Sequence, residues 1–398
     1  MQYQSECLSA LKSVVNIHKP FEKTFMDAMK LFMAIPDRIN FLQLGRYGCF
    51  SEQTYRNLFE HETFDWFAFN GSIISKHLTG KRKAIAIDPS YIPKSGKKTP
   101  WIGYFWSGCA GQAKRGLEIL GVGAIDIDKR DCVMLKAEQT PDTITLDNVG
   151  CTLIDWYLKV LERIKDRLLE VSNYVVADAY FSKATFTKGL DSMGFHLVSR
   201  FRDDANLMYI HDGQPTGKRG RPKVHGDKID FKHLDYTKIQ EIETNNEDGK
   251  LYTLIAYSQA MKRKIRLVIW INKKGKHKLY FSTDINMSAR DVIDFYRTRF
   301  QIEFCYRDAK QFTGLYHSQA RDIRRLDFAF NASFTAINAA KIMMKENSIP
   351  FSMEALKSLM FNSYLLDRFF KLSGIKPNSR IKDKLVKELI DIAAYQVA

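Results

Sequence analysis

Two short apolar runs, residues 84–87 and 174–177, are each followed directly by an aspartate. These aspartates are Asp88 and Asp178. Apolar runs of this length, bounded by turn residues, are typical of buried strands. A sheet brings the ends of neighbouring strands together, so the two carboxylates can share one site. A lone aspartate at a strand end is more often a turn or cap residue, and only the pair favours a site.

The pattern around these runs predicts an α/β core. Three further strands and two helices are expected: strands at 117–127, 132–137 and 195–201, and helices at 146–169 and 184–192. Strands that alternate with helices indicate a mixed sheet flanked by helices. Asp126 and Asp128 flank the turn between the first two of these strands, and we interpret them as turn residues.

After residue 203 the pattern changes to strands separated by Lys/Gly turns. The expected strands are 252–257, 265–272 and 278–283. They predict a β-rich insertion into the α/β core. Helical patterns resume near residue 289 and continue to the end of the chain. Residues 1 to about 75 also predict short helices, one of them starting at Ser51.

The formal net charge of +16 indicates a polyanionic partner. Nucleic acid is the commonest such partner, and its phosphates would supply most of the affinity. An acidic membrane surface is the rival, but no long basic amphipathic helix supports it. The most apolar window, 326–344, is broken by charged and amide residues, so it predicts a packed helix rather than a membrane span.

The six cysteines are scattered, with no CxxC pair and no His/Cys cluster at zinc spacing. This pattern is typical of buried, reduced thiols in a cytoplasmic protein. The amino terminus shows no signal-peptide pattern, and we therefore expect a cytoplasmic location.

One helical stretch gathers polar side chains on a single face. Wound as one α-helix, residues 296–310 project Tyr296, Arg299, Glu303 and Lys310 within an arc of roughly 60°. The apolar residues of the opposite side are Phe295, Ile302, Cys305, Ala309 and Phe312. Such a face is usually solvated surface. A lone carboxylate among cationic and phenolic donors also suits a metal ion held against phosphate, and the two strand-end aspartates favour that interpretation.

These residues resemble the DDE transposases of bacterial insertion sequences. The resemblance is carried by IAIDPSYIPKSGKK around Asp88, by VVADAYFSK around Asp178, and by the Y-(2)-R-(3)-E-(6)-K spacing of the helical stretch. It covers the chain from about Asp88 to Lys310, and the fourfold spacing is specific. One departure is that AYFSK follows Asp178, without the arginine and acidic residues of some relatives, which weakens the transfer of neighbouring roles.

The resemblance implies a ribonuclease-H-like α/β fold with a β-strand insertion. The residue patterns add helical N- and C-terminal regions. It implies Asp88, Asp178 and Glu303 as catalytic residues and as ligands of two Mg²⁺ ions, with Mn²⁺ as the alternative metal. It also implies that three further side chains contact DNA phosphates near the scissile bond: Tyr296, Arg299 and Lys310. Arg307 lies on the same helix face outside the signature, and we count it among the candidate DNA contacts with its role open.

The resulting domain prediction has five segments. They are a helical DNA-binding region (1–75), the first part of the catalytic core (76–205), the β-rich insertion (206–287), the second part of the core with the Glu303 helix (288–320), and a helical C-terminal region (321–398).

Weaker candidates for DNA contacts lie outside the helix. The basic loop that contains Arg219 and Arg221 resembles an AT-hook core, with a solvated loop as the equal alternative. Arg200 lies at the end of an expected strand and can reach the DNA backbone, although ordinary surface charge explains it as well. Trp270 lies on an insertion strand, and the resemblance implies that it stacks on an extruded base. A core position is the better-supported interpretation of this tryptophan.

The expected function is a DNA transposase that cleaves transposon ends and transfers their 3′-OH strands to target DNA by two-metal phosphoryl transfer. The expected partners are double-stranded DNA, as terminal inverted repeats and as target, and a second copy of the chain on synapsis, with no membrane. The expected location is a prokaryotic cytoplasm, in association with the nucleoid. The alternatives are a nuclease or resolvase of the same fold and a non-catalytic DNA-binding regulator.

Overall fold

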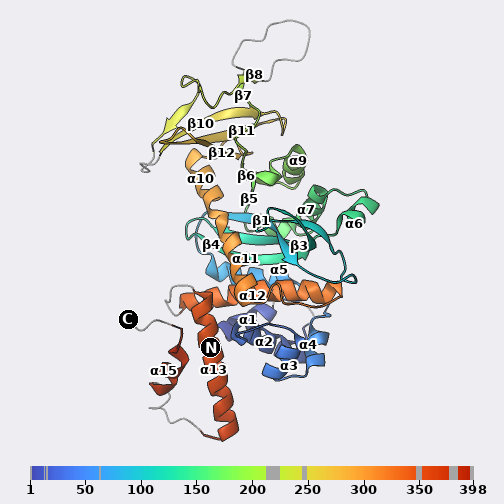
Figure 1. Ribbon diagram of the computed structural model, residues 1–398. Helices are drawn as coiled ribbons and strands as arrows, with labels where there is room; N and C mark the ends of the chain where they lie inside the picture. Colours follow the sequence, from blue (N-terminus) through green and yellow to red (C-terminus); the bar gives the residue numbers. More distant parts are fainter. Residues whose placement is uncertain are drawn as a thin grey trace.

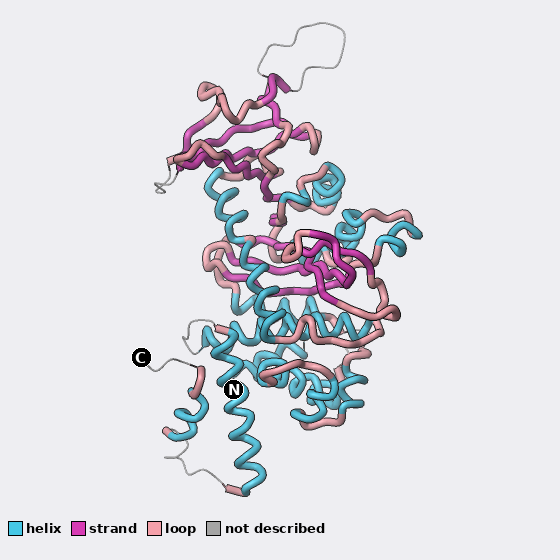
Figure 2. The backbone as a smooth tube through the Cα atoms, in the orientation of Figure 1, coloured by secondary structure: helices cyan, strands magenta, loops and turns pink. Residues whose placement is uncertain are grey.

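The computed structural model describes residues 2–12, 14, 17–61, 64–211, 225–243, 249–346, 352–375 and 384–394 (Figures 1 and 2). Its strands are β1 (Lys83–Pro93), β2 (Gly103–Ser107), β3 (Gln112–Asp126), β4 (Asp131–Gln139), β5 (Tyr174–Val176), β6 (His196–Arg200), β7 (Leu207–Ile210), β8 (His225–Lys228), β9 (Gln240–Ile242), β10 (Gly249–Ser258), β11 (Arg263–Asn272) and β12 (His277–Ser282).

The helices lie before, between and after these strands. They are α1 (Gln2–Lys12), α2 (Lys19–Ala34), α3 (Phe41–Tyr47), α4 (Glu52–Leu58), α5 (Trp66–His77), α6 (Thr143–Asn148), α7 (Leu153–Glu162), α8 (Lys165–Leu169), the 3-10 helix η1 (Ala179–Phe181), α9 (Ala184–Ser192), α10 (Ala289–Thr298), α11 (Phe300–Phe312), α12 (Ile323–Glu346), α13 (Met353–Ser373) and α15 (Leu385–Asp391).

The strands of the described residues form one twelve-stranded mixed sheet. Its order is β2-β3-β1-β5-β6-β12-β11-β10-β7-β8, with β4 beside β3 and β9 beside β10. Within the core, β1, β3 and β4 are successive antiparallel neighbours, whereas β5 and β6 run parallel to β1. The predicted fold class, a ribonuclease-H-like mixed sheet flanked by helices, is confirmed.

The two faces of the core sheet are buried against different helices. Because side chains alternate along a strand, Ala84 and Ala86 of β1 contribute to one apolar cluster, and Ile85 and Ile87 contribute to the other. The first cluster contains residues of α1, α2, α5 and α10 to α13, whereas the second contains residues of α7 to α9. Asp88 has the same parity as Ala84 and Ala86, so it belongs to the face that α11 covers.

The insertion strands extend the core sheet at one end. Strand β12 pairs antiparallel with β6, with Tyr280 opposite Arg200, and β11 and β10 follow outward. Figure 1 shows these strands at the top of the molecule, the core strands in the middle, and α1 to α4, α12 and α13 below. The insertion is therefore continuous with the core sheet, and the five domain boundaries remain a prediction.

Most expected elements have counterparts, but the expected single helix at 146–169 is wrong. That segment forms the three helices α6, α7 and α8. Gly150 adopts a positive φ of 59°, which ends the first helix in a conformation that suits glycine. Thr152 and Asp155 then form a capping box that begins α7 anew.

Two further expectations concern the thiols and the apolar window. All six cysteines are free, but Cys49 and Cys109 are exposed, so the expectation of uniformly buried thiols is wrong.

The apolar window lies in α12, whose Phe328, Phe330 and Phe334 are buried in the core. Across the described residues, none of the helices combines the length and the apolar character needed to cross a membrane.

Candidate active site

Asp88 and Asp178 lie on neighbouring parallel strands in matching positions. Ile85 is paired with Val175, and Ala86 with Val176. The same register, continued by two residues, places Asp88 level with Asp178. Neighbouring strands are about 4.8 Å apart, so the register places the two aspartates next to each other at the carboxyl end of β5.

The local structure holds Asp178 at this strand end. Its Oδ1 accepts a hydrogen bond from the backbone N–H of Tyr180 at 2.9 Å, and this contact caps the 3-10 helix η1. The hydroxyl of Ser199, on the adjacent strand β6, donates to the Asp178 carbonyl oxygen at 2.9 Å. Asp178 is thus a cap residue, as a lone strand-end aspartate often is, and its charge also acts on Asp88.

Glu303 reaches the same region from a helix that is almost continuous. Helices α10 and α11 meet at Arg299, whose φ of −49° and ψ of −35° remain helical. The junction is tightened, because Arg299 N donates to Tyr296 O and Ile302 N donates to Arg299 O. The predicted polar face therefore survives the interruption. On the opposite side Phe295, Ile302, Cys305 and Ala309 are buried, and Phe312 packs against them.

The Arg299 guanidinium lies between two of the carboxylates. Its Nη2 is 2.6 Å from Glu303 Oε1, and its Nη1 is 3.6 Å from Asp88 Oδ1. The side chain is only 7% exposed, whereas the Asp88 and Glu303 side chains are 20% and 38% exposed. Arg299 Nε and Nη1 have no hydrogen-bond partner among the described residues. The site thus contains a buried cation whose donors are only partly satisfied.

Electrostatic interactions connect the three carboxylates. Burial raises the pKa of Asp88 to about 7; the Arg299 charge opposes this rise, and the Glu303 and Asp178 charges add to it. Burial alone would lower the pKa of Arg299, but Asp88 and Glu303 outweigh it and raise the pKa above its usual value. The carboxylates are therefore close enough to destabilise one another, and a cation between them is favoured.

Lys310 and Tyr296 flank this centre. The Lys310 ammonium donates to the Ser90 hydroxyl at 2.8 Å, and burial lowers the pKa of Lys310. Tyr296 is buried and packs on Tyr280, with ring centroids 5.1 Å apart. All four residues of the spacing signature thus lie along one side of the junction, but Tyr296 and Arg299 are buried rather than solvated.

Two contacts at this site were missing from the sequence prediction. The hydroxyl of Tyr306 donates to the Asp88 carbonyl oxygen at 2.7 Å, which fastens α11 to β1. Ser90, the partner of Lys310, lies two residues after Asp88. Its position was available from the sequence, because alternate residues of a strand share a face. The role of Tyr306 depends on a tertiary contact that no local pattern contains.

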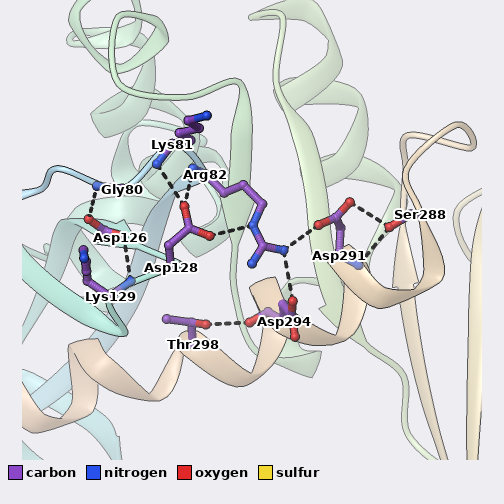
Figure 3. Close-up of polar contacts among 10 residues, drawn as sticks. All are labelled: Gly80, Lys81, Arg82, Asp126, Asp128, Lys129, Ser288, Asp291, Asp294 and Thr298. Carbon is purple, nitrogen blue, oxygen red and sulfur yellow. Dashed lines mark hydrogen bonds and ion pairs between the residues drawn. The ribbon is translucent and has the colours of Figure 1, made fainter. Parts of the chain in front are cut away.

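An ionic cluster fixes α10 against the start of β1 (Figure 3). Arg82 Nε lies 2.8 Å from Asp128 Oδ1, and Arg82 Nη1 lies 2.7 Å from Asp291 Oδ1 and 3.0 Å from Asp294 Oδ2. Asp128 also accepts from the backbone N–H groups of Lys81 and Arg82, as expected of a turn residue. The cluster connects the helix pair that carries Glu303 to the strand that carries Asp88.

The remaining candidates are distributed unevenly. Arg200 ends β6, and its charge acts on Tyr296, so it borders the site. Arg307 Nη2 pairs with Asp308, and its guanidinium lies over Phe304. Trp270, in β11, is partly buried against the core, which agrees with the core interpretation. The basic-loop arginines, Arg219 and Arg221, lie outside the described residues.

The donor set fits divalent metal ions in type. Asp88, Asp178 and Glu303 offer carboxylate oxygens, the ligands that Mg²⁺ prefers. The charges of Glu303 and Asp178 both raise the pKa of Asp88, and a cation bound among the three carboxylates would offset this repulsion. Their present spacing is wider than a metal centre needs. In the described part of the chain, no group of three or more His, Cys, Asp or Glu side chains is gathered tightly enough to hold an ion. Arg299 lies in the position between two of the three.

Comparisons with known proteins agree with this geometry. The family model described as "DDE superfamily endonuclease" matches residues 32–260, which is more than half of the chain. The model described as "Archaeal putative transposase ISC1217" matches residues 248–345. The first match contains Asp88 and Asp178, and the second contains Glu303. No curated protein matches the chain. Members of the DDE superfamily are nuclease-type enzymes that generally use divalent metal ions. The chain is thus a member of the DDE superfamily of endonucleases, the superfamily of insertion-sequence transposases.

Proposed function

We propose that this protein cleaves the ends of its insertion sequence and joins the resulting 3′-OH strands to target DNA. The observation that carries the proposal is the convergence of Asp88, Asp178 and Glu303 from β1, the end of β5 and α11, with the buried Arg299 between two of them. A pure DNA-binding protein gains nothing from carboxylates placed where a phosphate must lie.

In this proposal Asp88, Asp178 and Glu303 hold two Mg²⁺ ions, or Mn²⁺ in their place. Bound there, the ions supply an activated water and stabilise the leaving oxygen during in-line displacement at phosphorus. Ligation by Glu303 requires that Arg299 release its 2.6 Å contact with this carboxylate. The freed guanidinium is then available to a phosphate oxygen, for which its planar donors are suited.

Two other side chains are assigned to the DNA. Lys310, held by Ser90 two residues from Asp88, neutralises a phosphate next to the scissile one. Tyr296, held by Tyr280, positions the backbone on the side of Arg200. Each acts on a phosphate that is fixed relative to β1, so their contribution is positioning and charge stabilisation. A second copy of the chain would hold the other end of the element.

The experiment starts from the DNA that flanks the gene, inspected for inverted repeats bounded by a short target duplication. A linear duplex ending in that repeat is incubated with the protein, Mg²⁺ and a supercoiled plasmid. The expected result is cleavage at the repeat edge together with plasmid-joined products. Cleavage without joined products would indicate a nuclease or resolvase. Specific binding without any cleavage would indicate a non-catalytic regulator.

A further inference from the structure

A strongly cationic cavity lies away from the carboxylates. It has a volume of about 780 Å³ and lies between the start of α3, the loop after β1 and the loop after α11. Five of its described lining residues are cationic: Arg38, Arg56, Lys94, Arg321 and Arg325. The same described lining contains no aspartate or glutamate. A concave surface of one charge sign attracts and concentrates ions of the other sign.

Two of the five cations are neutralised by carboxylates outside the cavity. Arg56 pairs with Glu52 along α4, and Arg325 pairs with Glu60. Because each of these two arginines already has a carboxylate partner, we do not count either one among the cations available to a bound anion. The guanidinium of Arg56 also lies 4.8 Å from the Phe41 ring centroid, which further fixes its position.

The other three cations, Arg38, Lys94 and Arg321, form no ion pair within the described residues. The Lys94 ammonium donates to the Ser318 carbonyl oxygen at 2.6 Å, a contact that orients it without neutralising it. Burial, together with the charges of Arg321 and Arg38, lowers the pKa of Lys94 to about 8. The three cations are thus close enough to repel one another, and an anion between them would relieve the repulsion.

Strand β1 connects the candidate active site to the cavity. Strand β1 carries Asp88, then Ser90 with its partner Lys310, and Lys94 follows directly after its end. Six residues of extended chain span about 20 Å. Successive phosphates of one DNA strand are about 3.4 Å apart along the helix axis. For a duplex whose axis runs along β1, the distance from Asp88 to Lys94 corresponds to about six nucleotides.

We propose that Arg38, Lys94 and Arg321 form a binding site for the phosphate backbone of the end-bearing DNA duplex, about six nucleotides from the phosphate at Asp88. The inference extends the proposed function, since it assumes that DNA reaches the carboxylate site. It assigns the cavity between the helical region and the core to backbone contact, which positions DNA without reading its sequence.

The test measures binding of the full-length chain to an end-bearing duplex without added metal, so that no cleavage occurs. The variants are Arg38→Ala, Arg321→Ala and their double variant. Both arginines are exposed, and neither substitution removes a core contact. We expect the double variant to lower affinity on the order of tenfold near physiological salt. The slope of log K against log salt should also fall by about two, one for each lost phosphate contact.

The matched control is Lys188→Ala, which removes an exposed cation of α9, a helix that packs on the other face of the sheet. Lys188→Ala should leave affinity and salt slope unchanged. The inference would be overturned if the double variant kept the wild-type affinity and salt slope. It would also be overturned if Lys188→Ala lost as much affinity as the double variant. Thermal unfolding midpoints of all variants separate a binding effect from misfolding.

Phosphate-ethylation interference then locates the contact. Interference about six nucleotides from the repeat edge, where cleavage is expected, should be present with the wild-type protein and absent with the double variant. Loss of affinity for random duplex alone would overturn the assignment to the end-bearing DNA. A protein that shows this interference but cuts no DNA would refute the proposed function and leave the phosphate site standing.

Discussion

At the residue scale, the position of Asp88 depends on the small residue opposite it. Gly121 of β3 is the antiparallel partner of Asp88. A Cβ built on Gly121 would collide with the Tyr306 hydroxyl and lie 2.8 Å from Met134 Cε. The absence of a side chain there lets Tyr306 reach the Asp88 carbonyl oxygen. One glycine thus allows the contact between α11 and β1.

Gly121→Ala should therefore destabilise the protein and misplace Asp88. Overpacking of this kind costs about 1–3 kcal/mol, measured as the free energy of unfolding in urea. The matched control is Gly108→Ala, because a Cβ at Gly108 has nothing within 4 Å. A loss of stability in Gly108→Ala equal to that in Gly121→Ala would contradict this account.

A second residue-scale feature is the partly buried ion pair between Lys341 and Asp131. The Lys341 ammonium lies 2.8 Å from Asp131 Oδ1, and His77 Nε2 lies 2.9 Å from Asp131 Oδ2. Lys341 also donates to the Cys132 carbonyl oxygen at 2.6 Å. Burial alone would raise the pKa of Asp131, but His77 and Lys341 outweigh it and hold the pKa well below its ordinary value. The pair connects α12 to the start of β4.

Asp131→Asn should cost about 2–3 kcal/mol at pH 7, because it removes a carboxylate that offsets the charge of buried Lys341. Asp131 itself is partly exposed, so we place the loss at the low end for such pairs. The folded-state pKa of Asp131 is depressed. Its contribution is therefore present above the unfolded pKa of about 3.9 and is lost as pH falls below it. Urea unfolding of both proteins should show a constant gap above about pH 5 that shrinks below about pH 4. A gap that widens on acidification would refute this assignment.

At the scale of elements, the helix pair α10–α11 is held at both ends of its contact with the core. Tyr306 fastens α11 to β1, and Arg82 joins the start of β1 to Asp291 and Asp294 of α10 (Figure 3). The Arg82 cluster is partly exposed, so each of its pairs contributes little by itself. Its arrangement as one arginine among three carboxylates makes the cluster worth more than an isolated pair.

Arg82→Ala should lower the free energy of unfolding by about 1–2 kcal/mol at low ionic strength. The loss should be smaller in about 1 M NaCl, because salt screens exposed charges. Urea titrations at the two salt concentrations measure it. Lys81→Ala is the matched control, since only the backbone N–H of Lys81 contacts Asp128. Equal losses at both salt concentrations would show that the cluster does not act through charge.

Some of the helices and strands could be predicted from the sequence, and others could not. The strand–aspartate repeat predicted β1 and β5, because a buried strand needs only a short apolar run. The helix expected at 146–169 was wrong, because apolar periodicity continued across Gly150 while the backbone did not. The edge strand β2 was not predicted, since Tyr104 and Trp106 are exposed and its alternation lacks a polar side. Local patterns thus located buried elements better than exposed ones.

At the scale of the whole molecule, the candidate site is assembled from parts far apart in the chain. Asp88, Asp178 and Glu303 come from three segments, and the sheet register and the α11 contacts bring them together. The sequence alone was enough to select these three carboxylates, from the strand ends and from the spacing of the helical stretch. The burial of Arg299 between two carboxylates could not be predicted, because it depends on packing between α11 and β1. The same holds for the cationic cavity, whose walls come from three separate segments.

We propose that Asp88, Asp178 and Glu303 act together as one cleavage site. The most direct test of this proposal is the single-turnover rate of Mg²⁺-dependent cleavage of the end-bearing duplex by Asp88→Asn, Asp178→Asn, Glu303→Gln and the triple variant. Asp147→Asn serves as control, because Asp147 is an exposed carboxylate of α6. We predict that each single variant loses at least about 10³-fold in rate while still binding the duplex, and that the triple variant is no slower than the single ones. Near-native cleavage by any one of the three single variants would contradict the account.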